Sequence, residues 1–291
     1  MNIHNQLSPS NFKFFDIHYH ASPDLYDRKY DVFSTGKIYK NLDGAVVLKS
    51  HLGATTIQAT LAQQVGLPVF PSLVLNHING GISFKNILKA LAEYQPNIPS
   101  KLIVHFPTIT GRNYQSLLTR QISKTYLSKE TLKSETLFDN SDSLRPEVID
   151  ILKLSRDYPI ILSTGHASKL EIYHLINACI QFNVPSLLLN QPANPLSGFK
   201  ATELIELDSH PFIWIEQTAL TYVLGYQCKD DFRNVLRCVR NLIYSSDFGQ
   251  TNQMNIQEWL AYSKQWFAEF NLSLKRQKEI CLKNPSNLLL M

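Results

Sequence analysis

Short apolar runs alternate with amphipathic segments along nearly the whole chain. The apolar runs are close to continuous instead of alternating apolar with polar residues, which is typical of parallel strands buried on both faces. Most of them end in polar or charged residues. We predict strands over Phe14–His20, Ala45–Lys49, Pro68–Leu75, Lys101–His105, Pro159–Ser163, Pro185–Leu189, Pro211–Thr218 and Asn241–Asp247.

The segments between and after these strands have apolar residues at helical spacing. Pro146 stands where a proline is tolerated, in the first turn of a helix, and Ser273 is a plausible N-cap. Helices are expected over Ser34–Leu42, Thr55–Val65, Ile82–Tyr94, Pro146–Arg156, Lys169–Phe182, Lys200–Leu207, Lys229–Arg240, Ile256–Phe270 and Leu274–Lys283. The alternation predicts an α/β fold, a (β/α)8 TIM barrel that forms a single domain over residues 1–291.

Residues 111–145 fit this alternation least well. The stretch Ser123–Phe138 has β-branched residues and alternating polarity, which favours strands over a helix. We therefore expect an inserted hairpin or lid beside the site. Substrate specificity is expected to lie in this and the other loops that follow the strands, which have no recognisable motif.

Composition narrows the class of protein. A length of 291 residues suits one barrel. The net charge of +4 is spread without a block of like charges, so nothing indicates a nucleic-acid partner. The chain has no apolar stretch long enough for a membrane span. We expect no secretory leader, because the first residues lack an apolar core and a small-residue cleavage site. The four cysteines are isolated in the sequence. We expect a cytoplasmic protein that acts on a small molecule, and many barrels of this type form homo-oligomers.

Histidines and other polar residues concentrate where the predicted strands end. His18 and His20 stand at i and i+2, which places both imidazoles on one face of a strand. The carboxyl ends of barrel strands form the active-site face, so residues from different strands meet there. Converging imidazoles indicate a zinc or similar divalent-metal site. The other strand-end residues are Lys49, His51, His77, His105, His166, Asn190 and Asp247.

These motifs resemble the amidohydrolase superfamily of metal-dependent hydrolases, in an uncharacterised branch. The similarity rests on the order His-x-His on strand one, histidine on strand five and aspartate on strand eight, and on the ending Asn284-Pro285-Ser286-Asn287-Leu288-Leu289. The Lys49-Ser50-His51, Thr164-Gly165-His166 and Ser245-Ser246-Asp247-Phe248-Gly249 elements are also similar. The resemblance implies that His18, His20, His166 and Asp247 are metal ligands and that Asp247 is the general base.

The sequence departs from that superfamily at two positions. Members with two metals often have a carboxylated lysine on strand four, whereas this chain has His105 there and Lys49 on strand two. Asn190 stands where many members have a strand-six histidine, and an amide oxygen is a poorer zinc ligand than imidazole. We therefore expect one divalent metal, zinc before manganese or iron, and disfavour a second metal bridged by Lys49.

The remaining polar strand-end residues are candidates for catalysis or substrate binding. Lys49 is assigned either a functional role, as a carboxylate-binding or carbamate-forming group, or a structural ion pair with Asp16 or Glu216. Glu216 could hydrogen-bond a metal ligand or orient His166. The candidate catalytic residues are Asp247, His166 and Lys49, and the candidate substrate-binding residues are His51, His105, Arg28, Asn190 and Glu216.

Alternatives remain for several of these residues and for the function. His51 and His105 could either line the pocket or hydrogen-bond other site residues. Arg28 could clamp an anionic substrate or be a solvated loop residue. The leading hypothesis is a metal-dependent hydrolase of a small cyclic amide, lactone, amide or ester. The alternative is a non-hydrolytic barrel, either a binding protein that has lost catalysis or a lyase or isomerase with the same metal site.

Overall fold

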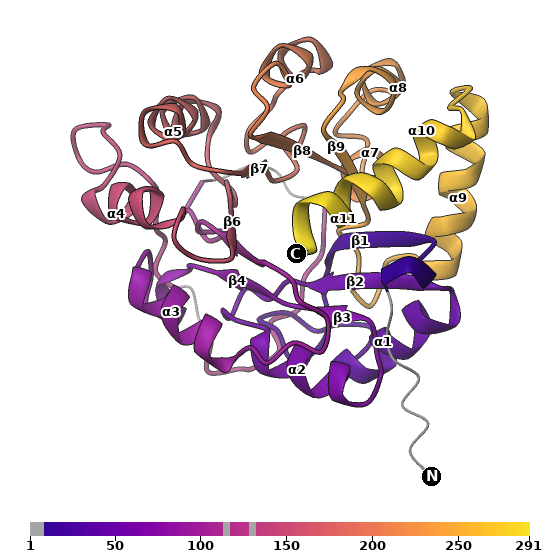
Figure 1. The fold of residues 1–291 in the computed structure, drawn as a ribbon, viewed down its shortest axis with the longest axis horizontal. Helices are drawn as coiled ribbons and strands as arrows, with labels where there is room; N and C mark the ends of the chain where they lie inside the picture. The colour runs from indigo at the N-terminus through magenta and orange to yellow at the C-terminus, as the bar shows by residue number, and fades with distance from the viewer. Residues whose placement is uncertain (1–8, 113–116, 128–131) are drawn as a thin grey trace.

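Parallel strands form a central ring and helices pack around its outside (Figure 1). The computed structural model describes residues 9–112, 117–127 and 132–291. Each strand in the chain pairs in parallel with the strand that follows it, except between β3 and β4. The strands are β1 (Phe14–Tyr19), β2 (Gly44–Leu48), β3 (Val69–Phe70), β4 (Ser72–Val74), β5 (Leu102–His105), β6 (Ile160–Ser163), β7 (Leu187–Leu189), β8 (Ile213–Thr218) and β9 (Leu242–Ser245).

The ring is continuous at the two places where strand pairing is interrupted. Strands β3 and β4 are the two halves of the predicted third strand, separated by Pro71, which has no N–H to donate. After β9, the Asp247 N–H donates to the His18 carbonyl at 2.8 Å, and the His20 N–H donates to the Phe248 carbonyl at 2.9 Å. The last strand is thereby joined to the first. The predicted α/β barrel fold is confirmed.

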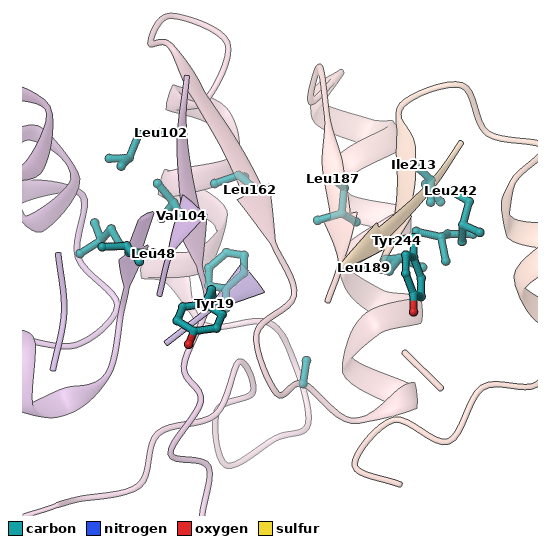
Figure 2. Close-up of a cluster of buried hydrophobic side chains, with 14 of the residues drawn as sticks. Tyr19, Leu48, Leu102, Val104, Leu162, Leu187, Leu189, Ile213, Leu242 and Tyr244 are labelled. Atoms are coloured by element: carbon teal, nitrogen blue, oxygen red, sulfur yellow. The ribbon is translucent and has the colours of Figure 1, made fainter. Parts of the chain in front are cut away.

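Two apolar layers lie on the two faces of the strands because successive side chains point to opposite faces. Phe15 and Ile17 belong to the layer inside the ring, together with Val47 and Phe70. The outer layer packs beneath the helices and includes Tyr19, Leu48, Val104, Leu187 and Tyr244 (Figure 2). Burial on both faces explains why the strands are continuous apolar runs in the sequence.

Most predicted helices are present with shifted ends. Capping boxes fix the starts of α5, at Ser168 and Glu171, and of α9, at Asn255 and Glu258. No helix among the described residues has the length and apolar character that a membrane crossing requires. The helices are α1 (Val32–Asn41), α2 (Thr56–Gln64), α3 (Phe84–Glu93), α4 (Pro146–Leu154), α5 (Lys169–Phe182), α6 (Ala201–Leu207), α7 (Ala219–Val223), α8 (Lys229–Cys238), α9 (Ile256–Glu269), α10 (Leu274–Lys278) and α11 (Asn284–Leu289), with short 3-10 turns at Pro9–Asn11 and His77–Asn79.

The sequence prediction was incomplete at the C-terminus. The expected helix Leu274–Lys283 is α10 followed by a π-helical turn, η3 (Glu279–Lys283), and a further helix, α11, was not predicted. Figure 1 shows α11 at the centre of the ring, where it contacts β1 and β9. This segment therefore covers the end of the barrel opposite the carboxyl ends of the strands.

The described part of residues 111–145 runs beside the barrel as a largely irregular segment. It contains an isolated antiparallel bridge between Phe138 and Leu144 and another between Ile122 and Tyr26. The predicted hairpin over Ser123–Phe138 includes residues 128–131, which lie outside the described residues. The bridge to Tyr26 joins this segment to the loop after β1. The predicted lid stays a prediction.

The buried side chain of Asp16 on β1 links the first strand to the end of the last strand through hydrogen bonds. Its Oδ1 accepts hydrogen bonds from the backbone N–H groups of His18, at 3.1 Å, and Ser246, at 3.0 Å. Its Oδ2 accepts one from the Tyr39 hydroxyl at 2.5 Å. The carboxyl group is fully buried, and burial raises its pKa to about 6.

Replacing Asp16 with alanine is expected to lower the free energy of unfolding by about 3–5 kcal/mol, because three buried donors lose their acceptor. Asp16→Asn is the matched control, since its amide oxygen can still accept from both backbone N–H groups. We expect it to lose less than half as much. Urea unfolding of both variants checks the prediction, and equal losses would contradict it.

Candidate metal centre and active site

The side chains of His18, His20 and Asp247 converge at the carboxyl end of β1. His18 Nε2 lies 3.0 Å from Asp247 Oδ1, and His20 Nε2 lies 3.3 Å from the same oxygen. Candidate ligand atoms of the three residues all lie within 4.8 Å of one another. Two imidazole nitrogens and a carboxylate oxygen are donors that zinc and similar divalent ions prefer.

A carboxylate lies behind each of the two imidazoles. Glu216 Oε1 on β8 lies 3.0 Å from His18 Nδ1, and Asp24 Oδ2 lies 3.6 Å from His20 Nδ1. Metal-ligating histidines usually present their second ring nitrogen to a carboxylate, which fixes the tautomer and orients the ring. The Glu216 contact therefore leaves His18 Nε2 for a metal ion. The Asp24 carboxylate is beyond hydrogen-bond distance of His20 Nδ1, which has no hydrogen-bond partner among the described residues. Glu216 contacts a predicted ligand, as the sequence suggested, but that ligand is His18 and not His166.

The loop after β9 adopts a backbone conformation that presents Asp247. Asp247 has φ +58°, in the left-handed region that aspartate tolerates better than most residues. Gly249 has φ +126°, and a Cβ there would lie 1.9 Å from the His20 carbonyl oxygen. Only glycine allows this close approach. Backbone conformations of this kind concentrate at functional sites. Here they allow the loop to lie directly against the end of β1.

Asp24 is a central site residue that sequence reasoning missed. Its Oδ2 accepts from Arg28 Nε at 2.7 Å and contacts Arg28 Nη2. Its Oδ1 accepts from the Ser50 hydroxyl at 3.0 Å and from the His51 N–H at 2.7 Å. Although burial opposes charge, the contacts to His20 and Arg28 hold the pKa of Asp24 well below its usual range. The four-residue spacing of Asp24 and Arg28 was visible, but it has no predictive value outside a helix.

A second group of potential ligands, formed by His20, Asp24 and His51, fits a cation poorly. Its ligand atoms also lie close together. Both Asp24 oxygens are already hydrogen-bonded, however, and the Arg28 guanidinium stands directly against the carboxylate. Arg28 is buried, so its interpretation as a solvated loop residue was wrong.

Lys49 lies inside the barrel, beneath the cluster formed by His18, His20 and Asp247. It is fully buried, and its ammonium group donates to Asn190 Oδ1 at 2.9 Å. This hydrogen bond replaces the direct ion pair with Asp16 or Glu216 that the sequence suggested. Burial lowers the pKa of Lys49 to about 8, although the charges of Glu216 and Asp247 oppose this shift.

The other predicted histidines lie in three different places. His51 and His166 line the pocket above the cluster, whereas His105 lies lower in the barrel. His51 Nδ1 is 2.8 Å from the Thr108 hydroxyl, and His105 Nδ1 is 2.8 Å from the Ser163 hydroxyl. His166 Nε2 lies 3.2 Å from Gln191 Nε2, outside the close group formed by His18, His20 and Asp247. His77 lies on an exposed turn away from the pocket.

The pocket above the cluster leaves a space of about 20 Å³, enough for a water molecule. Its walls include Arg28, Arg120, Gln191 and Tyr226, whereas Glu216 and Asn190 lie beneath it. Arg120 comes from the irregular segment, and its guanidinium lies 5.2 Å from the centre of the Tyr26 ring. Sequence reasoning missed Arg120 and Gln191, because neither stands in a motif.

Charge is distributed unevenly among the imidazoles. Burial lowers the pKa of His20, His51, His105 and His166 below the usual value, and the neutral form that results is the form that binds metals. His18 is the exception. Although burial opposes its protonation, the carboxylates of Asp247 and Glu216 raise the pKa of His18 to about 9.

Comparisons with solved structures identify proteins with the same fold. A protein of Pseudomonas putida assigned as a 2-pyrone-4,6-dicarboxylic acid hydrolase is similar with a TM-score of 0.56 and 12% identity, over 95% of this chain and 97% of that one. One of Acinetobacter baumannii with the same assignment, solved with citric acid bound, has a TM-score of 0.53 and 15% identity, over 95% and 99%. At these identities the likeness confirms the fold that the resemblance to the amidohydrolase superfamily implied.

The sequence comparisons give a family without a known activity. No protein of curated function matches the sequence. A family model matches residues 13–216, which include β1 to β7, the first part of β8 and every candidate site residue that the sequence predicted except Asp247. Because this match spans well over half of the chain, the protein belongs to the family of unknown function DUF6282.

Proposed function

We propose that this protein is a metal-dependent hydrolase of a small molecule, with one divalent ion held by His18, His20 and Asp247. The observation that supports this most strongly is the convergence of both Nε2 atoms on one carboxylate oxygen, with a second carboxylate behind each ring. An ion pair network with no chemical role would not need both imidazoles to expose the same nitrogen to one point. His166, on the wall of the same pocket, is the candidate fourth ligand.

The chain's own residues can handle the proton transfers of a hydrolysis. A divalent cation at this site would lower the pKa of water and polarise a carbonyl. Asp247 contacts both imidazoles through Oδ1, which leaves Oδ2 to accept a proton from water in the pocket and deliver it to the leaving group. Glu216 holds the His18 imidazole through the contact at Nδ1, and the Asp24 carboxylate lies behind the His20 ring. Cyclic amides, lactones, amides and esters are the substrates that this chemistry suits.

The pocket wall favours a substrate with an anionic group. Arg120 Nε is buried and has no hydrogen-bond partner among the described residues, although its guanidinium stacks on Tyr26. Arg28, by contrast, is already neutralised by Asp24. A carboxylate on the substrate would satisfy the Arg120 donor and its charge. We therefore expect carboxylated lactones and cyclic amides to be better substrates than their neutral analogues.

The metal content of the native chain tests the proposal. We expect about one equivalent of zinc, manganese or iron per chain, measured by elemental mass spectrometry after purification without chelators. The loaded protein is then assayed against a panel of lactones, cyclic amides and esters with and without a carboxylate. Two equivalents would bring in Lys49 as a bridge. A chain that holds no metal, or a loaded chain that hydrolyses nothing in the panel, would favour the non-hydrolytic barrel.

Replacing Arg120 with glutamine is expected to raise KM for a carboxylated substrate about 10- to 100-fold, the loss of one charged hydrogen bond, with kcat changed little. Lys124→Gln is the matched control, because it removes the same charge from an exposed position of the same segment. Its KM should stay within about twofold of the native value. A fall in kcat without a change in KM would contradict the assignment of Arg120.

The pH dependence of zinc binding should reflect His18. Because the pKa of His18 is raised to about 9 in the metal-free protein, zinc must displace a proton from this ring at neutral pH. Zinc affinity is therefore expected to weaken about tenfold for each unit of decrease in pH between 8 and 7. Competition with a chromophoric chelator measures it. An affinity that is constant over this range would show that His18 is neutral without metal.

A further inference from the structure

A groove on the other side of the barrel, away from the metal centre, has the features of a second ligand site. It lies between the start of β1, helix α9 and the π-helical turn η3, and its cavity volume is about 590 Å³. Pockets for small molecules usually measure about 300–1,000 Å³ and are lined by aromatic and apolar groups. His18 lies near the opposite end of β1, and His20 directly follows that strand. A ligand in this groove therefore does not reach the proposed active site.

Aromatic side chains form the walls of the groove and are held by their own packing. Phe14 meets Trp259 edge to face, with ring centres 6.1 Å apart, and Tyr244 packs on Phe267 at 5.1 Å. All four rings are almost fully buried by the protein, so the wall is preformed. The π-helical turn opposite contributes Leu282, and π-helical turns occur often at functional sites.

The polar atoms of the wall are satisfied internally. Trp259 Nε1 donates to the Tyr244 hydroxyl at 3.3 Å, and the Ser263 hydroxyl donates to the Trp259 carbonyl at 2.7 Å. The Tyr244 hydroxyl is 2.7 Å from Ser263 Oγ and is left to donate to it. Each of these groups has a partner inside the protein, so the wall favours an apolar body over a polar one.

The rim of the groove is positively charged. Lys264 on α9 and Lys278 on α10 line it and are exposed. Lys13 also lines it but pairs with Asp43 at 2.8 Å. No aspartate or glutamate is among the described residues that line the groove. An apolar wall with two lysines at its edge is complementary to an apolar chain that ends in an anion.

We propose that this groove binds an amphipathic carboxylate, the chemistry of a medium-chain fatty acid. The apolar chain lies along the half-buried side chains of Leu42, Leu260 and Leu282, which line the groove together with the aromatic rings, and the carboxylate faces Lys264 and Lys278. The site is independent of the proposed hydrolase activity, because none of these residues lines the pocket of the metal centre.

Calorimetric titration of the full chain with decanoate, below its micelle concentration, tests the site. We expect saturable binding of one decanoate per chain and at least about tenfold weaker binding of decyltrimethylammonium, which has the same tail and the opposite charge. The double variant Lys264→Glu/Lys278→Glu should bind decanoate about tenfold more weakly. The matched control is Lys275→Glu/Lys283→Glu, which makes the same charge change at exposed positions outside the groove.

A variant that fills the groove tests whether decanoate binding needs the space in the groove as well as the charge at its rim. Cys281→Phe should abolish decanoate binding while thermal unfolding shows an intact fold and the metal content is unchanged. Equal weakening in the two lysine variants, equal affinity for the cationic probe, or no saturable binding would each overturn the proposal. A native dimer that Lys264→Glu/Lys278→Glu dissociates, without decanoate binding, would assign the groove to a second copy of the chain instead and also overturn it.

Discussion

The Asp247→Asn variant is expected to lose about 10³- to 10⁴-fold in kcat, with KM within a few-fold of the native value, because an amide cannot accept the proton that the carboxylate takes. The loss should be larger for amides than for esters with good leaving groups, since Asp247 also delivers the proton that a poor leaving group needs in order to depart. The measurement is kcat and KM of the metal-loaded variant beside those of the native enzyme.

The fold of this variant should be preserved. The Asp247 N–H to His18 carbonyl hydrogen bond that helps to close the barrel belongs to the backbone, and asparagine tolerates the left-handed φ of this position as well as aspartate does. Asp142→Asn is the matched control, because Asp142 is also an aspartate with positive φ, at 55°, but is exposed and far from the pocket. If Asp247→Asn retains native kcat, Asp247 is not the base.

The placement of the candidate metal ligands could be predicted because the topology of the barrel forces it. Residues at the carboxyl ends of parallel strands meet on one face whatever the loops do. The strand pattern and the strand order were therefore enough to predict that His18, His20 and Asp247 lie close together. Asn190 and Lys49 were placed at strand ends for the same reason, and the structure finds them hydrogen-bonded to each other.

Residues on the loops could not be placed in this way. Asp24 is held by contacts that depend on the path of the loop after β1, including the hydrogen bond from the Ser123 hydroxyl to the Asp24 carbonyl, which joins residues 99 positions apart. Arg120 reaches the pocket because the Gln121 carbonyl accepts from the Asp27 N–H. Neither contact leaves a periodic pattern in the sequence, and a single sequence offers no other signal for such pairs.

Removing the proposed ligand His18 should reduce metal binding more than removing the Glu216 carboxylate behind it. His18→Ala deletes a proposed ligand and is expected to reduce the metal content to less than about a tenth of an equivalent. Glu216→Gln should weaken zinc affinity about 10- to 100-fold, as is usual for the group behind a metal-binding histidine. Equilibrium competition for zinc, with elemental mass spectrometry of the purified variants, measures both effects.

The physical reason for the Glu216 effect lies in its three hydrogen bonds. Glu216 Oε1 accepts from the Ser245 hydroxyl at 2.7 Å and contacts His18 Nδ1, and Oε2 accepts from the Gln191 N–H at 3.0 Å. A glutamine amide turns an NH₂ group toward one of these sides, so it either loses the Gln191 donor or stops supporting a protonated Nδ1 on His18. The His18 tautomer that leaves Nε2 free for the metal is then no longer favoured.

The control for both variants is His77→Ala, which removes a histidine from an exposed turn after β4. It should keep native metal content, because His77 does not line the pocket. If Glu216→Gln keeps native zinc affinity while His18→Ala loses the metal, His18 binds the ion without help from Glu216. Native metal content in His18→Ala would place the ion elsewhere, since the convergence of His18 Nε2 and His20 Nε2 on Asp247 is the geometry on which the proposed centre depends.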